Sequence, residues 1–281
     1  MTTVFTNLEE WNRYRNDISD TKNLGCAPTL GGLHEGHFSL MRRSLSENDL
    51  TVVTIFLNRA QFNNPADYQN YPANFEEDIA AARRLGVDAV FAPPHEALYP
   101  DSYRYKVSES ELSLSMEGAH RPGHFDGVLT VVLKLFNILR PKRAYFGEKD
   151  YQQLQLVKDM VKAFLLPVEI VSCPTIRDDD GLALSSRNRR LSPAARVKAA
   201  RFPEILANAE SAGRAISELS EAGFEVEYVE ERDGRRFGAV VLENVRLIDN
   251  ISLNVPDVQL PGVSTRSGMS QTCRNKGISE R

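Results

Sequence analysis

Cysteine is scarce in this sequence and is not arranged to build a disulfide framework or a zinc ribbon. The three cysteines, Cys26, Cys173 and Cys273, are far apart, odd in number and without CxxC spacing. Disulfides persist mainly in oxidising compartments. We therefore expect reduced thiols in a cytoplasmic protein.

Long apolar runs and a secretory leader are also lacking. The longest apolar stretch, residues 128–139, is interrupted by Thr130, Lys134 and Asn137, and it is far shorter than the roughly 20 apolar residues that cross a bilayer. The N-terminus reads MTTVFTN, without the basic and then apolar segments of a signal peptide. We expect neither a membrane anchor nor a membrane partner.

Excess positive charge is absent as well. The 34 Lys and Arg residues are outnumbered by 38 Asp and Glu residues, so the formal net charge is −4. Proteins that bind nucleic acid through a broad basic surface show the opposite balance, and we expect no nucleic-acid partner. The 281 residues are 42% hydrophobic and 26% charged, which is typical of a folded globular protein of about two domains.

Apolar segments alternate with segments of helical spacing through the first part of the chain. Strands are predicted at residues 24–28, 50–57, 87–92, 143–146 and 168–173. Helices are predicted at residues 6–15, 38–46, 74–85, 125–139 and 151–164. The strand at 50–57 is apolar on both faces, as parallel strands covered on both sides are. This order predicts an α/β fold, a Rossmann-like parallel sheet with helices on both faces.

A small α+β domain is predicted to follow. An alanine-rich helix opens at Ser192 and is expected to run to about Ala212, with a second short helix after it. Three antiparallel strands are predicted next, at residues 224–229, 237–242 and 246–248. We therefore divide the chain into a catalytic domain, a small α+β domain and a polar tail that we expect to be disordered, at residues 1–187, 188–252 and 253–281.

The densest chemical signal is PTLGGLHEGH at residues 28–37, where a predicted strand ends and a helix begins. Glycines there let the backbone approach a ligand, and a helix N-terminus offers unpaired N–H groups to phosphate. His34 and His37 share one face, from which they can donate hydrogen bonds to a leaving phosphate. Taken alone, two histidines at this spacing are more often structural than catalytic. A zinc site of the HExxH type needs histidines at i and i+4, whereas His34 and His37 are at i and i+3.

A second polar segment, YFGEKDYQQ at residues 145–153, also joins a strand to a helix. Lys149 is a point charge suited to phosphate, and Asp150 is placed to cap the helix. Gln153 follows one turn later on the same side. A solvated helix start with a surface ion pair is the ordinary alternative.

Two more segments lie at predicted strand ends. Residues 175–188 form a loop whose glycine, serines and Arg187 are suited to close over a triphosphate, and FLNRAQF at residues 56–62 ends the most apolar strand. Ligands of open parallel sheets bind beyond the carboxyl ends of the strands. We therefore expect the four segments to form one site.

Together these segments resemble the pantoate–β-alanine ligase family. The resemblance covers roughly residues 1–250; besides residues 28–37, a HIGH-type nucleotidyltransferase motif, it rests on Asn58, Gln61, Tyr71, Pro72, RPGHF at 121–125, FGEKD at 146–150, SSRN at 185–188 and RLIDN at 246–250. It implies that pantoate attacks the α-phosphate of ATP, giving pantoyl adenylate and pyrophosphate. The amine of β-alanine then attacks the acyl carbon, giving pantothenate and AMP. It also implies Mg²⁺ with the nucleotide, a homodimer, and a C-terminal domain that shields the adenylate from water.

The resemblance further implies roles for individual residues. His34, His37 and Lys149 would be catalytic at the phosphates, with His37 as a proton donor, and no protein metal site is implied. Gln61 and Gln153 would bind pantoate, and Gln61 would also line the β-alanine route. The other ATP-binding positions would be Leu30, Gly31, Gly32, Leu33, Glu35, Gly36, Gly147, Glu148, Asp150, Ile176, Leu184, Ser185, Ser186 and Arg187.

The chain departs from the family pattern at a few positions. Leu30 and Leu184 replace the usual Met, which conserves volume, and Leu30 would wall the acid pocket with Pro28 and Phe62. Arg59 replaces the usual Pro beside Gln61, which keeps open a related adenylate-forming ligase with another acid or amine. A non-catalytic homologue is the third interpretation, but it predicts loss of the phosphate-contacting groups, which this sequence retains.

Overall fold

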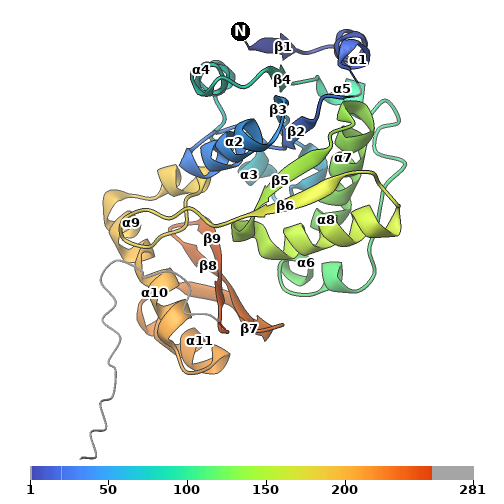
Figure 1. Cartoon of the computed structure of the whole chain (residues 1–281). Helices are drawn as coiled ribbons and strands as arrows, with labels where there is room; N and C mark the ends of the chain where they lie inside the picture. Colours follow the sequence, from blue (N-terminus) through green and yellow to red (C-terminus); the bar gives the residue numbers. More distant parts are fainter. Residues whose placement is uncertain (1, 20, 255–281) are drawn as a thin grey trace, which may run out of the picture.

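The larger of the two β-sheets is parallel and six-stranded. The computed structural model describes residues 2–19 and 21–254 (Figure 1). In this sheet the strand order is β1 (Thr3–Phe5), β4 (Ala89–Phe91), β3 (Leu50–Thr54), β2 (Leu24–Ala27), β5 (Arg143–Gly147) and β6 (Glu169–Cys173). From β2 the chain runs outward on one side through β3 and on the other through β5. Such a switch point opens a crevice beyond the strand ends.

Helices cover both faces of this sheet. One face packs against α1 (Leu8–Asp17), α7 (His124–Leu139) and α8 (Tyr151–Ala163), and the other against α2 (Glu35–Glu47) and α4 (Phe75–Leu85). Successive strand residues serve opposite faces, so Val52 joins the first core and Val53 the second. The predicted α/β fold with helices on both faces is confirmed.

Short helices complete this part of the chain. They are α3 (Pro65–Gln69), α5 (His95–Leu98) and α6 (Glu117–His120), with the 3₁₀ turns η1 (Arg59–Gln61), η2 (Leu112–Leu114), η3 (Glu148–Asp150) and η4 (Ser186–Arg190). Among the described residues, no helix is both long enough and apolar enough to cross a bilayer.

The C-terminal part, orange in Figure 1, has its own antiparallel sheet and its own core. Three helices precede three strands: α9 (Pro193–Ala199), α10 (Arg201–Asn208), α11 (Ala212–Glu221), β7 (Glu225–Arg232), β8 (Arg235–Leu242) and β9 (Val245–Ser252). The three predicted antiparallel strands are confirmed. Asp233 and Gly234, with φ of 52° and 73°, form the tight turn between β7 and β8.

The prediction of one alanine-rich helix to about Ala212 is wrong, because the structure divides it into α9 and α10. Pro203 has no N–H to continue the helix, and its ring clashes with the carbonyl four residues back, that of Ala199. Helix α9 therefore ends at Ala199. The prediction of a disordered tail, and Cys273 with it, fall almost entirely outside the described residues.

Candidate active site

A cavity of about 230 Å³ lies beyond the carboxyl ends of β2, β3, β5 and β6, at the switch point of the sheet. Its wall includes the predicted apolar residues Pro28, Leu30 and Phe62. It also includes most of the predicted polar site: His34, Gly36, His37, Gln61, Gly147, Lys149, Asp150, Gln153, Ile176, Leu184, Ser185, Ser186 and Arg187. The expectation that the four segments meet is confirmed.

Five of the predicted positions are absent from that wall: Gly31, Gly32, Leu33, Glu35 and Glu148. Glu35 is exposed and pairs with Arg42 on the outer face of α2. The other four lie in the two turns that carry the histidines and the lysine, and Leu33 packs into the hydrophobic core on that face of the sheet.

The glycine turn before α2 is closed by a buried carboxylate from another helix. The N–H groups of Gly32 and Leu33 donate to Asp78 of α4 at 2.8 and 2.7 Å, and the N–H of Gly31 donates to the Thr29 hydroxyl at 3.2 Å. Burial raises the pKa of the Asp78 carboxyl, against the effect of these two hydrogen bonds. The N–H groups of these three residues are therefore bonded within the protein.

The two glycines are required by the turn itself. Gly31 and Gly32 have φ of 85° and 66°, in the left-handed region that residues with a Cβ rarely adopt. A Cβ on Gly32 would lie 2.8 Å from the carbonyl oxygen of Pro72. The turn thus packs tightly on its neighbours and delivers the chain to α2 in a fixed direction.

His34 and His37 lie side by side at the start of α2, with ring centroids 4.1 Å apart. The Nδ1 of His34 accepts from the N–H of Gly36 at 3.2 Å, and the Nδ1 of His37 accepts from the N–H of His34 at 3.3 Å. Since each Nδ1 is an acceptor, the proton of each neutral ring is on Nε2. The site therefore holds two N–H donors in a fixed pair.

The electrostatics of the site keep both rings neutral. Burial, followed by the positive charges of Lys149 and Arg189, lowers the pKa of His34 to about 4. Burial, His34 and Lys149 lower the pKa of His37 to about 3. At neutral pH each imidazole donates a hydrogen bond while carrying no charge.

Lys149 lies in η3, on the opposite side of the switch point, and its turn is held by the C-terminal sheet. The side-chain amide of Asn250 in β9 donates to the carbonyl oxygens of Glu148 and Lys149, at 3.0 and 2.9 Å. The Lys149 ammonium is 3.8 Å from the Asp150 carboxylate. Asp150 occupies the N-cap position of α8, but its side chain makes no capping hydrogen bond. That prediction is wrong because η3 runs directly into α8 and Asp150 faces the cavity instead.

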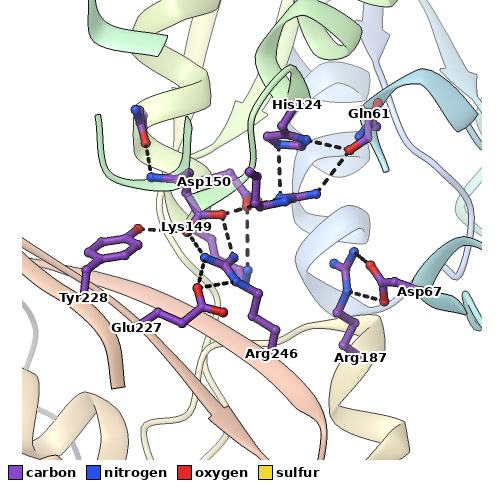
Figure 2. A network of polar contacts seen from close by, with 12 residues as sticks. Gln61, Asp67, His124, Lys149, Asp150, Arg187, Glu227, Tyr228 and Arg246 are labelled. Atoms are coloured by element: carbon purple, nitrogen blue, oxygen red, sulfur yellow. Dashed lines mark hydrogen bonds and ion pairs between the residues drawn. The ribbon is translucent and has the colours of Figure 1, made fainter. Parts of the chain in front are cut away.

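Gln61 is fixed through its backbone as well as its side chain (Figure 2). Its carbonyl oxygen accepts from Nδ1 of His124 at 2.7 Å and from Arg121 at 3.2 Å. Nε2 of His124 faces the Arg121 guanidinium at 3.2 Å and must accept from it. Burial and the adjacent Arg121 lower the pKa of His124 to about 3, so this ring is neutral as well.

Arg187 closes another side of the cavity (Figure 2). Its guanidinium forms two hydrogen bonds to Asp67 of α3, at 2.8 and 3.3 Å, and lies 5.4 Å from the ring centroid of Tyr71. Burial alone would raise the pKa of Asp67, but the hydrogen bond to Arg187 and the charges of Arg187, Arg190 and Arg121 together lower it. The Ser186 hydroxyl bonds the Tyr71 hydroxyl at 3.2 Å.

A buried ion pair joins the C-terminal sheet to α6. Glu117 of α6 accepts two hydrogen bonds from Arg246, both at 2.7 Å, and one from the Tyr228 hydroxyl at 2.8 Å (Figure 2). Burial would raise the pKa of Glu117, but the bonds and charge of Arg246, the charge of Arg121 and the bond from Tyr228 together lower it to about 2. A second cavity, of about 410 Å³, adjoins the first between the two sheets and shares Lys149 and Arg187 with it.

Several residues that build the site have no role predicted from the sequence. Arg121 and His124 belong to the RPGHF motif, which was a usable signal for them. Asp78 follows Glu76 and Glu77 in the first turn of α4, where acidic residues are ordinary, so nothing marked it. Arg59 is exposed and lies outside the cavity wall.

The described residues contain no group of three or more His, Cys, Asp or Glu side chains that could hold a metal ion. Asp150 places a carboxylate on the cavity wall beside Lys149. The hydrogen-bond donors on the cavity wall are imidazole, ammonium, guanidinium, amide and hydroxyl groups, which suit an anion with several oxygens.

The family model for pantoate-β-alanine ligase matches residues 3–252. A pantothenate synthetase of Legionella pneumophila (strain Corby) is 51% identical over 250 residues, covering 89% of this chain and 99% of that protein. One of Bdellovibrio bacteriovorus is 50% identical over 253 residues, covering 90% and 100%. The structure of a Francisella tularensis pantoate-β-alanine ligase with β-γ ATP and β-alanine is similar with a TM-score of 0.88 and 39% identity, covering 91% of this chain and 99% of that one. With these matches over nearly its whole described length, the chain belongs to the pantoate–β-alanine ligase family.

Proposed function

We propose that this cavity joins (R)-pantoate to β-alanine in two steps, using ATP and releasing pyrophosphate and AMP. The observation that carries the proposal is the pair of neutral imidazoles of His34 and His37, which face the same cavity as Lys149 and the two glutamines Gln61 and Gln153. Membership of the family and the ATP and β-alanine named for the Francisella relative support it.

In the first step a carboxylate oxygen of pantoate attacks the α-phosphorus, and the bond to the β-phosphate breaks with its electrons going to pyrophosphate. This step needs no covalent bond to the enzyme, only alignment and stabilisation of negative charge. We assign the Nε2–H groups of His34 and His37 and the ammonium of Lys149 to the phosphates. Because the pKa of His37 is lowered to about 3, its role is that of a hydrogen-bond donor, while Lys149 supplies the charge.

In the second step the neutral amine of β-alanine attacks the acyl carbon, and AMP leaves with the electrons of the acyl–oxygen bond. The proton on the attacking nitrogen is lost to solvent or to the departing phosphate. Gln61 and Gln153 would hold the acid, with Pro28, Leu30 and Phe62 against its gem-dimethyl group, and Gln61 would also border the β-alanine route. Their places on the cavity wall support these roles.

The nucleotide would lie between the two turns. Gly36, Gly147, Asp150, Ile176, Leu184, Ser185, Ser186 and Arg187 all border the cavity, and Gly31, Gly32, Leu33 and Glu148 would act by shaping its turns. Mg²⁺ would arrive with ATP and would neutralise part of the phosphate charge. Asp150 has the oxygen donors that this ion prefers.

We further propose that residues 1–187 form the catalytic domain and residues 188–252 a lid over the adenylate, in a cytoplasmic homodimer. The separate core of the C-terminal part supports the division. Free, buried Cys26 and Cys173 suit a reducing compartment. Arg59 is exposed outside the cavity and so gives no support to a different acid or amine.

The test is AMP release from ATP and Mg²⁺ with pantoate, with and without β-alanine, and identification of the product by mass. The proposal predicts AMP and pantothenate only when both substrates are present. Folded protein that binds ATP but gives neither AMP nor pantoate-dependent pyrophosphate exchange would refute it.

A further inference from the structure

The orientation of the Gln61 side-chain amide in the cavity is fixed by a hydrogen bond. Its Oε1 accepts a hydrogen bond from Nδ2 of Asn58 at 3.0 Å. The amide nitrogen Nε2 is the other end of the same planar group, so it is the end left to meet a ligand. Gln61 therefore presents a donor to the cavity, and its partner there must be an acceptor, such as a carboxylate or hydroxyl oxygen.

The orientation of Asn58 is itself dictated by its surroundings. Asn58 is fully buried, and its Nδ2 also donates to the carbonyl oxygen of Gly127 at 3.0 Å. A flipped amide would set Oδ1 against that carbonyl, which can only accept. Gly127 also packs closely on the backbone of η1, since a Cβ at this position would lie 2.5 Å from the carbonyl oxygen of Ala60.

The third polar contact of Asn58 comes from Tyr99, just after α5. The Tyr99 hydroxyl donates to Oδ1 of Asn58 at 2.9 Å. Tyr99 is 4% exposed, and its ring lies 4.6 Å from the Lys134 ammonium and edge-on to Tyr103 at 5.6 Å. Burial, then the neighbouring Tyr103, raises the pKa of Tyr99, so the hydroxyl keeps the proton that it donates.

From this chain of contacts we propose that Tyr99 is a positioning residue for the acid substrate. It holds the Asn58 amide, and through it holds Gln61 with its N–H₂ toward the cavity. Tyr99 lies outside the cavity wall, so it acts without touching substrate. The inference rests on the proposed function, because it takes Gln61 as a pantoate-binding residue.

The test is pantoate-dependent exchange of labelled pyrophosphate into ATP by the full chain, comparing wild type with Tyr99→Phe. The variant removes only the hydroxyl. We expect the KM for pantoate to rise roughly five- to tenfold, as loss of one neutral hydrogen bond allows, while the KM for ATP stays within about twofold. Tyr103→Phe is the matched control, since among the described contacts the Asn58 amide bonds Tyr99, Gln61 and Gly127 and not Tyr103.

A second arm separates positioning from general loosening of the fold. In a Gln61→Ala background, Tyr99→Phe should raise the KM for pantoate no further, because the group through which it acts is gone. A full additional increase there, equal rises in both KM values, or an unchanged KM for pantoate in Tyr99→Phe alone would overturn the inference. Wild-type protein without any pantoate-dependent exchange would instead refute the proposed function, and the role of Tyr99 with it.

Discussion

The two turns that carry the proposed catalytic groups are built in different ways. The turn from β2 to α2, with His34 and His37, is closed by Asp78 of α4, a helix that packs on the parallel sheet. The turn from β5 to α8, with Lys149, is held by Asn250 of the C-terminal sheet. Both lie at strand ends beside the same cavity, so sequence position alone suggests that they are equivalent.

This difference divides the site into a preformed half and a dependent half. In the histidine turn the N–H groups of Gly32 and Leu33 bond Asp78 of α4, and the two imidazoles accept hydrogen bonds from N–H groups of the same turn. The place of Lys149 depends on how β9 packs against η3. A lid that carries Asn250 would thereby couple its own closure to the position of the charge at the phosphates.

We expect the largest effects from substitutions that remove one proposed catalytic group, either His37 or Lys149. His37→Ala and Lys149→Ala should each slow pantoate-dependent pyrophosphate exchange by about 10²–10³-fold, the scale for removing one transition-state donor. Unfolding midpoints measured alongside would show that the variants are folded. A near-normal rate in either folded variant would remove that residue from the mechanism.

Acid should weaken the side of the site built on neutral histidines. The pKa of His124 is lowered to about 3 in the folded chain and is near 6.5 when unfolded, so the unfolded state binds the extra proton as pH falls below about 6.5. The stability from neutral His124 is thus complete above that pH and is lost progressively toward about pH 3. At pH 5 the loss is about 2 kcal/mol, or roughly thirtyfold in the unfolding equilibrium.

Urea unfolding at pH 7 and pH 5 measures how much the free energy of unfolding falls between the two pH values. His124→Gln should lose correspondingly less stability between the two pH values than wild type. His95→Gln is the control, because His95 is exposed. The same pH sensitivity in all three proteins would contradict the assignment.

The histidine turn should be sensitive to Asp78→Asn. The variant keeps one acceptor oxygen and loses the other, which leaves the N–H of Gly32 or Leu33 unsatisfied at a cost of about 1–3 kcal/mol. We expect kcat to fall by roughly tenfold, because a small displacement of the imidazoles reduces alignment. Glu77→Gln, an exposed neighbour that loses the same charge, should retain wild-type kcat and stability.

The lysine turn should be sensitive to Asn250→Ala. Loss of the two hydrogen bonds to η3 should raise the KM for ATP by roughly threefold to tenfold, the effect of losing about 1 kcal/mol of positioning. Asn208→Ala is the control, since Asn208 is exposed at the end of α10 and bonds only its own helix among the described contacts. An unchanged KM for ATP in Asn250→Ala would show that β9 does not hold Lys149 in place.

The smallest effect is expected at Arg59. Because its side chain is exposed outside the cavity, Arg59→Ala should change the KM for pantoate by less than about twofold, as surface substitutions do. A larger change in KM, or a changed preference among short hydroxy acids, would support the alternative hypothesis that Arg59 selects another substrate.

The fold was predictable because its signals are local. Alternating apolar strands and helices mark the parallel sheet, and Asn74 and Gly86 mark the ends of α4. Strand β1 was missed because three residues carry too little pattern. The break between α9 and α10 was missed although Pro203 marks it in the sequence.

The residues that line the site were predictable from the sequence, but the hydrogen bonds that hold its two turns in place were not. The motifs at strand ends identify which residues meet, since parallel strands bring their carboxyl ends together. The groups that hold the two turns are distant in sequence: Asp78 is 46 residues from Gly32, and Asn250 is 101 residues from Lys149. Asp78 looks like an ordinary helix-start acid until the fold places it under the glycine turn.

The most direct test of the division into two halves is amide hydrogen exchange, resolved by residue, in Asp78→Asn and Asn250→Ala. We expect faster exchange at residues 31–37 in Asp78→Asn with residues 147–153 unchanged, and the reverse pattern in Asn250→Ala. Faster exchange in both segments in either variant would contradict this division, because the two turns would then be held as one unit.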